Sequence, residues 1–221
     1  MNSINEQLKA LYSKYWEGYR EHILNVVEAA SPFLIYASDR YVNAEKKVLF
    51  CGQETLGWED GIHQKGTTVE GLMKVYDDFV NNGSYRSPYW NFQRRLMKAN
   101  PNLGFVQNNI VKIGRRAARG CDDNIDELAK MYFPVFKDEL DILRPDFIIF
   151  MTGPYYDWRI RAALGDFEKI KIGDDENCFD KLVFKDSSIP PSIRINHPGW
   201  LQRNNLYYLM ASRVDQILKT L

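Results

Sequence analysis

Three motifs place polar side chains next to short runs of apolar residues. Gly52-Gln53-Glu54 follows the apolar run 48–51, Asn109 lies inside the run 105–111, and His197 follows the run 193–195. A carboxylate, a carboxamide and an imidazole can bind the polar edge of a substrate and stabilise the charges that develop when a bond is cleaved. These three motifs are therefore the first candidates for a functional site.

The glycine of the first motif allows a sharp turn that exposes successive backbone N–H groups, and Glu54 adds a carboxylate. Trp58, four residues later, could stack on an aromatic ligand or pack in the domain. The alternative for Glu54 is an ordinary surface glutamate. The motif matches neither GxxxxGK[ST] nor GxGxxG, so nucleoside triphosphate chemistry is not expected.

Asn109 puts an amide inside an apolar strand, where burial without partners costs about 1–3 kcal/mol. A carboxamide offers a donor beside an acceptor, which matches the edge of a nucleobase such as uracil. The alternative is a structural asparagine that ties down a neighbouring loop. The sequence leaves both interpretations open.

His197 stands at the end of a predicted strand and is followed by Pro198, whereas His22 and His63 have no such placement. No HExxH motif occurs, and the three cysteines (Cys51, Cys121 and Cys178) lack CxxC spacing. We therefore expect neither a metal site nor a cofactor.

Four cations, Lys112, Arg115, Arg116 and Arg119, follow one another without an intervening acid, beginning at the carboxyl end of the second predicted strand. Such a run could contact phosphates, and its alternative is a solvated charged face. The location favours phosphate contact by Lys112, Arg115 and Arg116.

The apolar runs that carry these motifs have the continuous pattern of strands buried on both faces, and 147–151 is a further such run. Helical periodicity lies between them, in 3–27, 67–83, 87–96, 134–143 and 206–218. This alternation predicts an α/β fold, a three-layer αβα sandwich with a mainly parallel, about four-stranded central sheet. Segment 168–185 could form a hairpin or a surface excursion. Ligands of such sheets bind beyond the carboxyl ends of the strands.

The composition, 45% apolar and 26% charged over 221 residues, is that of a globular protein. We expect one domain over 1–221, with a helical region 1–45 packed on it. Because 29 basic residues balance 29 acidic ones, nucleic-acid binding would need a local patch. Neither a signal peptide nor an apolar run of about 20 residues is present, which favours a cytoplasmic monomer that does not bind membranes.

The ordered combination of Gly52-Gln53-Glu54, Asn109-Ile110-Val111-Lys112, a strand ending at Gly153 and His197-Pro198 resembles the uracil-DNA glycosylase superfamily. The resemblance runs from about Lys46 to Leu201. It implies a four-stranded parallel sheet between helices. It also implies hydrolysis of the N-glycosidic bond of a damaged base, usually uracil, without a metal.

Carried over by position, the resemblance makes Glu54 the group that activates water and stabilises the sugar cation, and His197 the donor to uracil O2. Asn109 would read the uracil edge with help from Gly52 and Gln53, and Leu201 would be the wedge that replaces a flipped nucleotide. The chain departs from the family pattern at Thr55, where proline is usual, and in having glutamate where one branch has aspartate.

Three functions follow from these observations. The first is a DNA glycosylase-like hydrolase that removes uracil or a related base from single- or double-stranded DNA. The second is a non-catalytic binder of nucleic acid or nucleobase with the same fold. The third is a hydrolase of small nucleoside-like metabolites, which suits the zero net charge.

Overall fold

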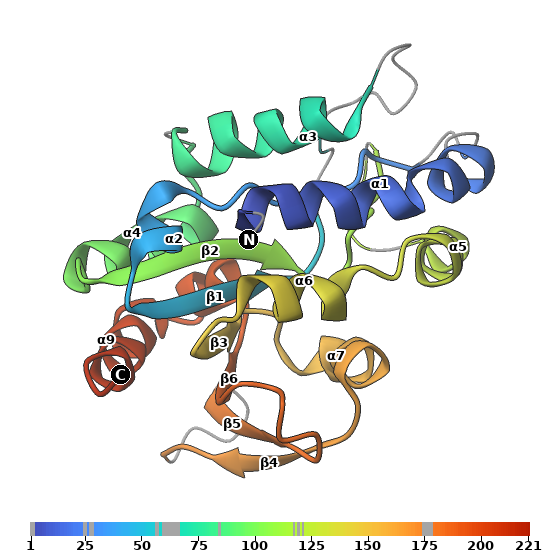
Figure 1. Ribbon diagram of the computed structural model, residues 1–221. Coiled ribbons are helices and arrows are strands. Elements are labelled where there is room, and N and C mark those ends of the chain that lie inside the picture. Colours follow the sequence, from blue (N-terminus) through green and yellow to red (C-terminus); the bar gives the residue numbers. More distant parts are fainter. Residues whose placement is uncertain are drawn as a thin grey trace. The chain divides into compact units, whose positions relative to one another are not determined.

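The computed structural model describes residues 3–23, 26, 29–55, 58, 67–83, 85–116, 118, 120, 122–173 and 179–221 (Figure 1). His63, Arg119, Cys121 and Cys178 lie outside these residues. The chain divides into two compact units. The first unit consists of Met1–Ser38, Gln53–Gly83 and Asn108–Arg144, and the second of Asp39–Gly52, Ser84–Gln107 and Pro145–Leu221. That the whole chain forms one domain stays a prediction.

The sheet has six strands in the order β2-β1-β3-β6-β5-β4. The pairs β1–β3 and β3–β6 are parallel, whereas β6–β5 and β5–β4 are antiparallel. All strands belong to the second unit except for the last two residues of β2. Their bounds are β1 (Lys46–Gly52), β2 (Leu103–Asn109), β3 (Phe147–Phe150), β4 (Phe167–Lys171), β5 (Phe179–Phe184) and β6 (Ser192–Ile195).

The α/β class is confirmed, and the four predicted apolar runs are the strands β1, β2, β3 and β6. The expected number of about four strands is wrong, and the sheet is mixed rather than mainly parallel. The difference is the hairpin of β4 and β5, which Figure 1 shows at the end of the sheet beside β6. Four of the five residues of β4 are exposed, so this edge strand lacks the continuous apolar run of a buried strand.

One core of the second unit lies between the sheet and three helices, α4 (Pro88–Ala99), α8 (Pro198–Arg203) and α9 (Tyr207–Leu218). At the start of the predicted helical segment 87–96, Ser87 caps α4 and Pro88 occupies its first turn. Phe92 and Leu96 of α4 and Val214 of α9 pack on strand residues such as Phe50. The unit also contains α2 (Asp39–Asn43), the 3₁₀-helix η2 (Pro154–Tyr156) and α7 (Asp157–Leu164).

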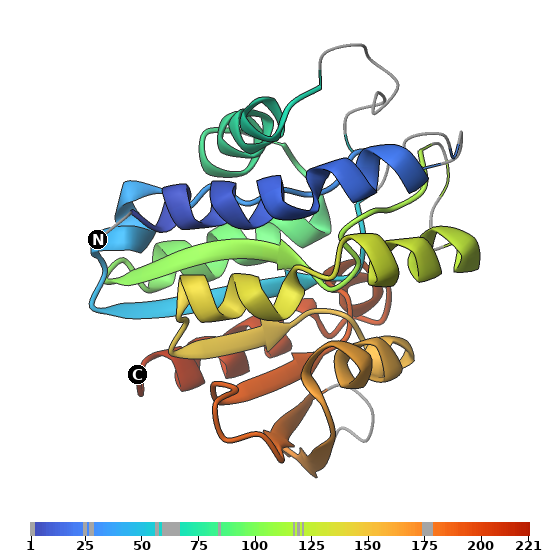
Figure 2. The same cartoon turned by 45° about the vertical axis from the view of Figure 1, so that its right-hand side comes forward.

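The first unit is helical. Figure 2 shows α1 (Ile4–His22) alongside α5 (Asp123–Tyr132) and α6 (Phe136–Leu143), and α1 also contacts α3 (Val69–Tyr76). Ser3 and Glu6 form a capping box at the start of the predicted helical segment 3–27. The helix ends at His22, earlier than predicted. The predicted segment 67–83 contains α3, which Thr68 caps and which continues into the π-helix η1 (Asp77–Asn81). No helix in the described part of the chain is long and apolar enough to cross a membrane.

Candidate functional site

In the second unit, the carboxyl ends of β1, β3 and β6 lie side by side. The Met151 N–H donates to the Cys51 carbonyl at 2.8 Å, and the Gly153 N–H donates to the Ile195 carbonyl at 2.9 Å. Gly153 has φ +70°, and a Cβ there would lie 3.0 Å from Asn196 Oδ1. The loops after β3 and β6 thus approach closely at the edge where open α/β sheets bind ligands.

His197 is fixed at this edge as the N-cap of α8. Its Nδ1 accepts the backbone N–H of Gly199 at 3.1 Å. A nitrogen that accepts a hydrogen bond carries no proton, so in this arrangement the proton of the neutral imidazole is on Nε2. The ring stacks on Tyr89 with 5.3 Å between centroids and 11° between planes, and the Tyr89 hydroxyl accepts a hydrogen bond from the Gln107 amide. These contacts hold His197 as an oriented Nε2–H donor.

Glu54 belongs to the first unit, where the loop after β1 is tied to the chain after β2. The Val111 N–H donates to the Gln53 carbonyl at 3.0 Å. Gly114 also lies close to Thr55, because a Cβ atom at Gly114 would lie 2.3 Å from the Thr55 carbonyl oxygen. The half-buried Glu54 accepts the Gly120 N–H at Oε1, at 3.1 Å. The carboxylate is therefore held by backbone rather than directed freely into water.

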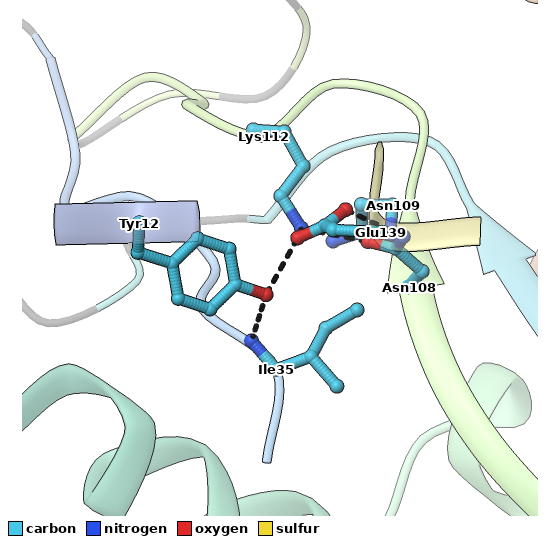
Figure 3. A network of polar contacts seen from close by, with 6 residues as sticks. All are labelled: Tyr12, Ile35, Asn108, Asn109, Lys112 and Glu139. Atoms are coloured by element: carbon cyan, nitrogen blue, oxygen red, sulfur yellow. Dashed lines mark hydrogen bonds and ion pairs between the residues drawn. The ribbon is translucent and has the colours of Figure 1, made fainter. Parts of the chain in front are cut away.

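Four side chains of the first unit form a buried polar cluster, which we call the Glu139 network: Tyr12, Asn108, Lys112 and Glu139 (Figure 3). Glu139 Oε1 accepts the Tyr12 hydroxyl and pairs with Lys112 Nζ, both at 2.7 Å. Glu139 Oε2 accepts the Asn108 amide at 2.9 Å, and Lys112 Nζ donates to Asn108 Oδ1 at 2.7 Å. The Ile35 N–H donates to the Tyr12 hydroxyl at 3.0 Å.

The network is shielded from water, since Glu139 is 0% and Lys112 5% exposed. Burial, and then repulsion from the Glu139 carboxylate, raises the pKa of the Tyr12 phenol well above its usual range. Asn108 Oδ1 also accepts the backbone N–H of Asn109 at 2.8 Å. Asn108 thus takes the structural role that the sequence analysis left open for an asparagine, and it fixes the backbone that carries the buried Asn109.

Two predicted DNA contacts are wrong. Lys112 is buried in an ion pair with Glu139, so its ammonium does not face phosphates. Leu201 is 0% exposed and belongs to the core between the sheet and the helices, so it is no wedge at the surface. Trp58 is 7% exposed and meets Phe33 and Phe79 edge to face, which makes it a core residue rather than a stacking platform.

The other predicted residues keep their candidate roles. Gly52 ends β1 in the second unit, and Gln53, Arg115 and Arg116 belong to the first. Arg115 and Arg116 are half-buried, and the backbone of Arg115 pairs with Ala29. Glu54 and Asn109 lie in the first unit and His197 in the second.

Two features of the structure could not be recognised from local sequence patterns. The buried carboxylate of Glu139 contacts a residue 127 positions away, and it is one of three acids in α6, so the local sequence does not single it out. The second feature is the segment 85–100, which contains four cations and no carboxylate: Arg86, Arg94, Arg95 and Lys98. Aromatic and other uncharged residues separate the cations of this segment, so the sequence does not show a dense basic run.

Among the residues that the structure describes, no group of three or more His, Cys, Asp or Glu side chains could hold a metal ion. No model of a known protein family matches the chain, and a search of curated proteins finds no match. Membership of the uracil-DNA glycosylase superfamily therefore stays a prediction based on the motifs.

Proposed function

We propose that this protein is a DNA glycosylase-like hydrolase that removes uracil or a related base by cleaving its N-glycosidic bond. A three-layer αβα arrangement, with helices on both faces of the sheet, is part of this proposal. The observation that carries it is the hydrogen bond from the Gly199 N–H to His197 Nδ1. It leaves Nε2–H as a neutral donor at the carboxyl edge of the parallel strands.

Neutral Nε2–H is the group that this reaction needs on the side of the base. When the bond between C1′ and the base nitrogen breaks, its electron pair goes to the base and positive charge develops on the sugar. A donor aimed at the base oxygen stabilises the negative charge. Water supplies the hydroxyl group that bonds to C1′, and its other proton passes through a general base to the departing nucleobase.

The remaining roles follow from residue chemistry. Glu54 would accept the proton from water and stabilise the sugar cation, because an ionised carboxylate does both. The Asn109 amide would pair with the N–H and carbonyl edge of the base. Water, a carboxylate, a carboxamide and an imidazole suffice for this hydrolysis, so the proposal includes no cofactor. Its partner is DNA.

The sharpest test is His197→Asn. Asparagine is a preferred N-cap residue and can accept the Gly199 N–H through Oδ1, so the cap of α8 is retained while the Nε2–H donor is lost. The assay incubates the protein with a single-stranded oligonucleotide that contains one uracil and measures alkali-labile abasic sites. We expect abasic product from the wild type. We expect about a 100-fold or greater loss in the variant, the usual effect of removing one such donor.

Three outcomes would contradict the proposal. The first is a wild-type protein that binds the oligonucleotide without forming abasic sites, which would indicate a binder. The second is base release from deoxyuridine but not from the oligonucleotide, which would indicate a hydrolase of nucleoside-like metabolites. The third is full activity in His197→Asn with an unchanged melting temperature, which would exclude His197 as the donor.

A further inference from the structure

A surface pocket of about 390 Å³ lies on the second unit, where α4 meets α8 and α9. Its walls include Pro88, Asn91 and Arg95 of α4, Gln202 of α8, and Tyr207 and Tyr208 of α9. Asn205 completes the lining and has φ +58°, a left-handed conformation that turns the chain between α8 and α9.

The lining combines an aromatic face with a cation. The Arg95 guanidinium lies 5.3 Å from the centroid of the Tyr208 ring, and the Tyr208 side chain is 71% exposed. The Tyr207 hydroxyl donates to the Pro88 carbonyl at 3.3 Å, which joins α9 to the start of α4. An exposed ring beside a guanidinium, with amide groups around it, matches an aromatic base attached to a phosphate.

Positive charge gathers around this pocket. The four cations of the segment 85–100 have no acidic residue among them, and Arg203 lies at the end of α8. Arg94 donates to Asn91 Oδ1 at 2.9 Å and to the Tyr85 carbonyl, so a second guanidinium is held beside the lining. Among the described residues that line the pocket there is no carboxylate. The charge of this surface is complementary to a phosphate backbone.

Large apolar side chains also reach solvent on the same segments. Tyr85 precedes α4, Trp200 lies on α8, and Tyr208 and Leu209 begin α9, and all four are exposed. Exposed apolar residues that cluster mark an interaction site, whereas scattered ones do not. Aromatic residues interleaved with arginines are the composition by which proteins hold unpaired bases and the phosphates between them.

We propose that this pocket binds a nucleotide of a single-stranded nucleic acid, with its base stacked on Tyr208 and its phosphate on Arg95. The inference rests on the proposed function, in which the target nucleotide lies at His197. Gln202 follows His197 by five residues, about 7 Å along a helix. Pro88 adjoins Tyr89, whose ring stacks on His197. The pocket would therefore hold a nucleotide that flanks the target in the same strand.

The test measures binding of a fluorescent single-stranded oligonucleotide without uracil, by anisotropy, so that it does not depend on catalysis. The variants are Arg95→Gln and Tyr208→Ala. Lys98→Gln is the matched control for charge, because Lys98 is an exposed cation on α4 outside the pocket lining. Ile170→Ala is the control for an exposed apolar side chain elsewhere in the unit, on β4.

We expect Arg95→Gln and Tyr208→Ala each to weaken binding about fivefold or more, the effect of losing one stacked base or its phosphate contact. Lys98→Gln and Ile170→Ala should stay within twofold of the wild type. Equal losses in Arg95→Gln and Lys98→Gln would overturn the subsite, because they would show non-specific attraction. So would competition by a free mononucleotide that is as strong as competition by the unlabelled strand.

Failure of this inference is distinct from failure of the proposed function. If the wild type forms abasic sites but Arg95→Gln and Tyr208→Ala bind normally, the pocket is not a nucleotide subsite and the hydrolase proposal stands. If the wild type forms no abasic sites, the hydrolase proposal is wrong, and the flanking role of the pocket is overturned with it. The anisotropy measurement then still shows whether the pocket binds single strands.

Discussion

The Glu139 network determines how the residues after β2 are held. Lys112 neutralises the Glu139 carboxylate, while Tyr12 and Asn108 use its other acceptor sites. Removing two charges from water is costly, and their attraction offsets that cost only where such additional hydrogen bonds exist. Because Asn108 Oδ1 also accepts the Asn109 N–H, the network positions the backbone of a candidate base-reading residue. We regard Glu139 as a positioning residue for Asn109.

Breaking the buried ion pair from one side should strongly destabilise the protein. In Glu139→Gln the Lys112 ammonium stays buried without a counter-charge, and we expect the free energy of unfolding in urea to fall by about 3–5 kcal/mol. In the double variant Glu139→Gln, Lys112→Met no charge remains, so most of this stability should return. Glu127→Gln, a glutamate exposed on α5, is the control. Equal destabilisation in the double and single variants would show that the charges are not coupled.

At the scale of single residues, the sequence predicts which loops carry polar side chains. It does not predict the role of a residue whose partners are distant in the chain. Glu54 and His197 follow strands as expected, because a strand end is a local signal. Lys112 looks like a surface cation until Glu139, 27 positions later, is brought to it. Leu201 is spaced like a wedge, yet its position on α8 directs it into the core. The local spacing of residues predicts neither the burial of Lys112 nor that of Leu201.

Among the elements, α4 and α9 are joined by a polar contact at the end of α4. The buried Asn100, which caps α4, donates through Nδ2 to Asp215 Oδ1 at 2.8 Å, and Asp215 Oδ2 pairs with Lys219 at 2.7 Å. The hydrogen bond from Lys219, followed by that from Asn100, lowers the pKa of Asp215. The same two helices carry the proposed nucleotide pocket, so this contact holds its walls together.

The pKa of Asp215 predicts an acid-dependent loss of stability. A carboxyl whose pKa is lowered by folding stabilises the folded state above its unfolded pKa of about 3.9, and the contribution disappears as the pH falls through the folded value. We expect Asp215→Asn to lower the free energy of unfolding by about 1 kcal/mol at pH 7. The difference from the wild type should shrink towards pH 3. Urea titrations at both pH values measure it, with the exposed Asp141→Asn as the control. A difference that is constant with pH would contradict the assignment.

Helices and central strands were predictable because burial leaves a recognisable pattern of apolar residues in their sequence. The parallel strands are buried along most of their length, and a continuous apolar run reveals them. The antiparallel pair β4 and β5 confirms the hairpin that was one of two possibilities for 168–185. Its charged, exposed residues form no continuous apolar run, so the sequence did not indicate that it extends the sheet. The ends of helices were less predictable, because they depend on capping residues more than on periodicity. The helix α1 ends at His22 instead of 27, and α3 begins at Val69 instead of 67.

On the scale of the whole molecule, the balance of 29 basic and 29 acidic residues excludes a general attraction to nucleic acid. Binding of a strand must then come from a local concentration of charge. With Lys112 buried, the segment 85–100 and Arg203 provide such a concentration on the second unit. The rest of the chain holds 29 − 5 = 24 basic and 29 acidic residues, so it should neither steer a strand from a distance nor add many phosphate contacts.

This charge distribution predicts a shallow salt dependence of single-strand binding. Each phosphate contact contributes about −0.7 to the slope of log K against log salt for a single strand, so contacts by Arg94, Arg95 and Arg203 give a slope of about −2. Anisotropy titrations between 50 and 200 mM salt, about the range over which such slopes are measured, test this value. Arg95→Gln should reduce the slope by about 0.7. Lys98→Gln should leave it unchanged, because Lys98 neither lines the pocket nor adjoins a lining residue in the chain, whereas Arg94 adjoins Arg95 and Arg203 adjoins Gln202. A slope of about −5 or steeper would show that the strand contacts many more cations than this surface holds.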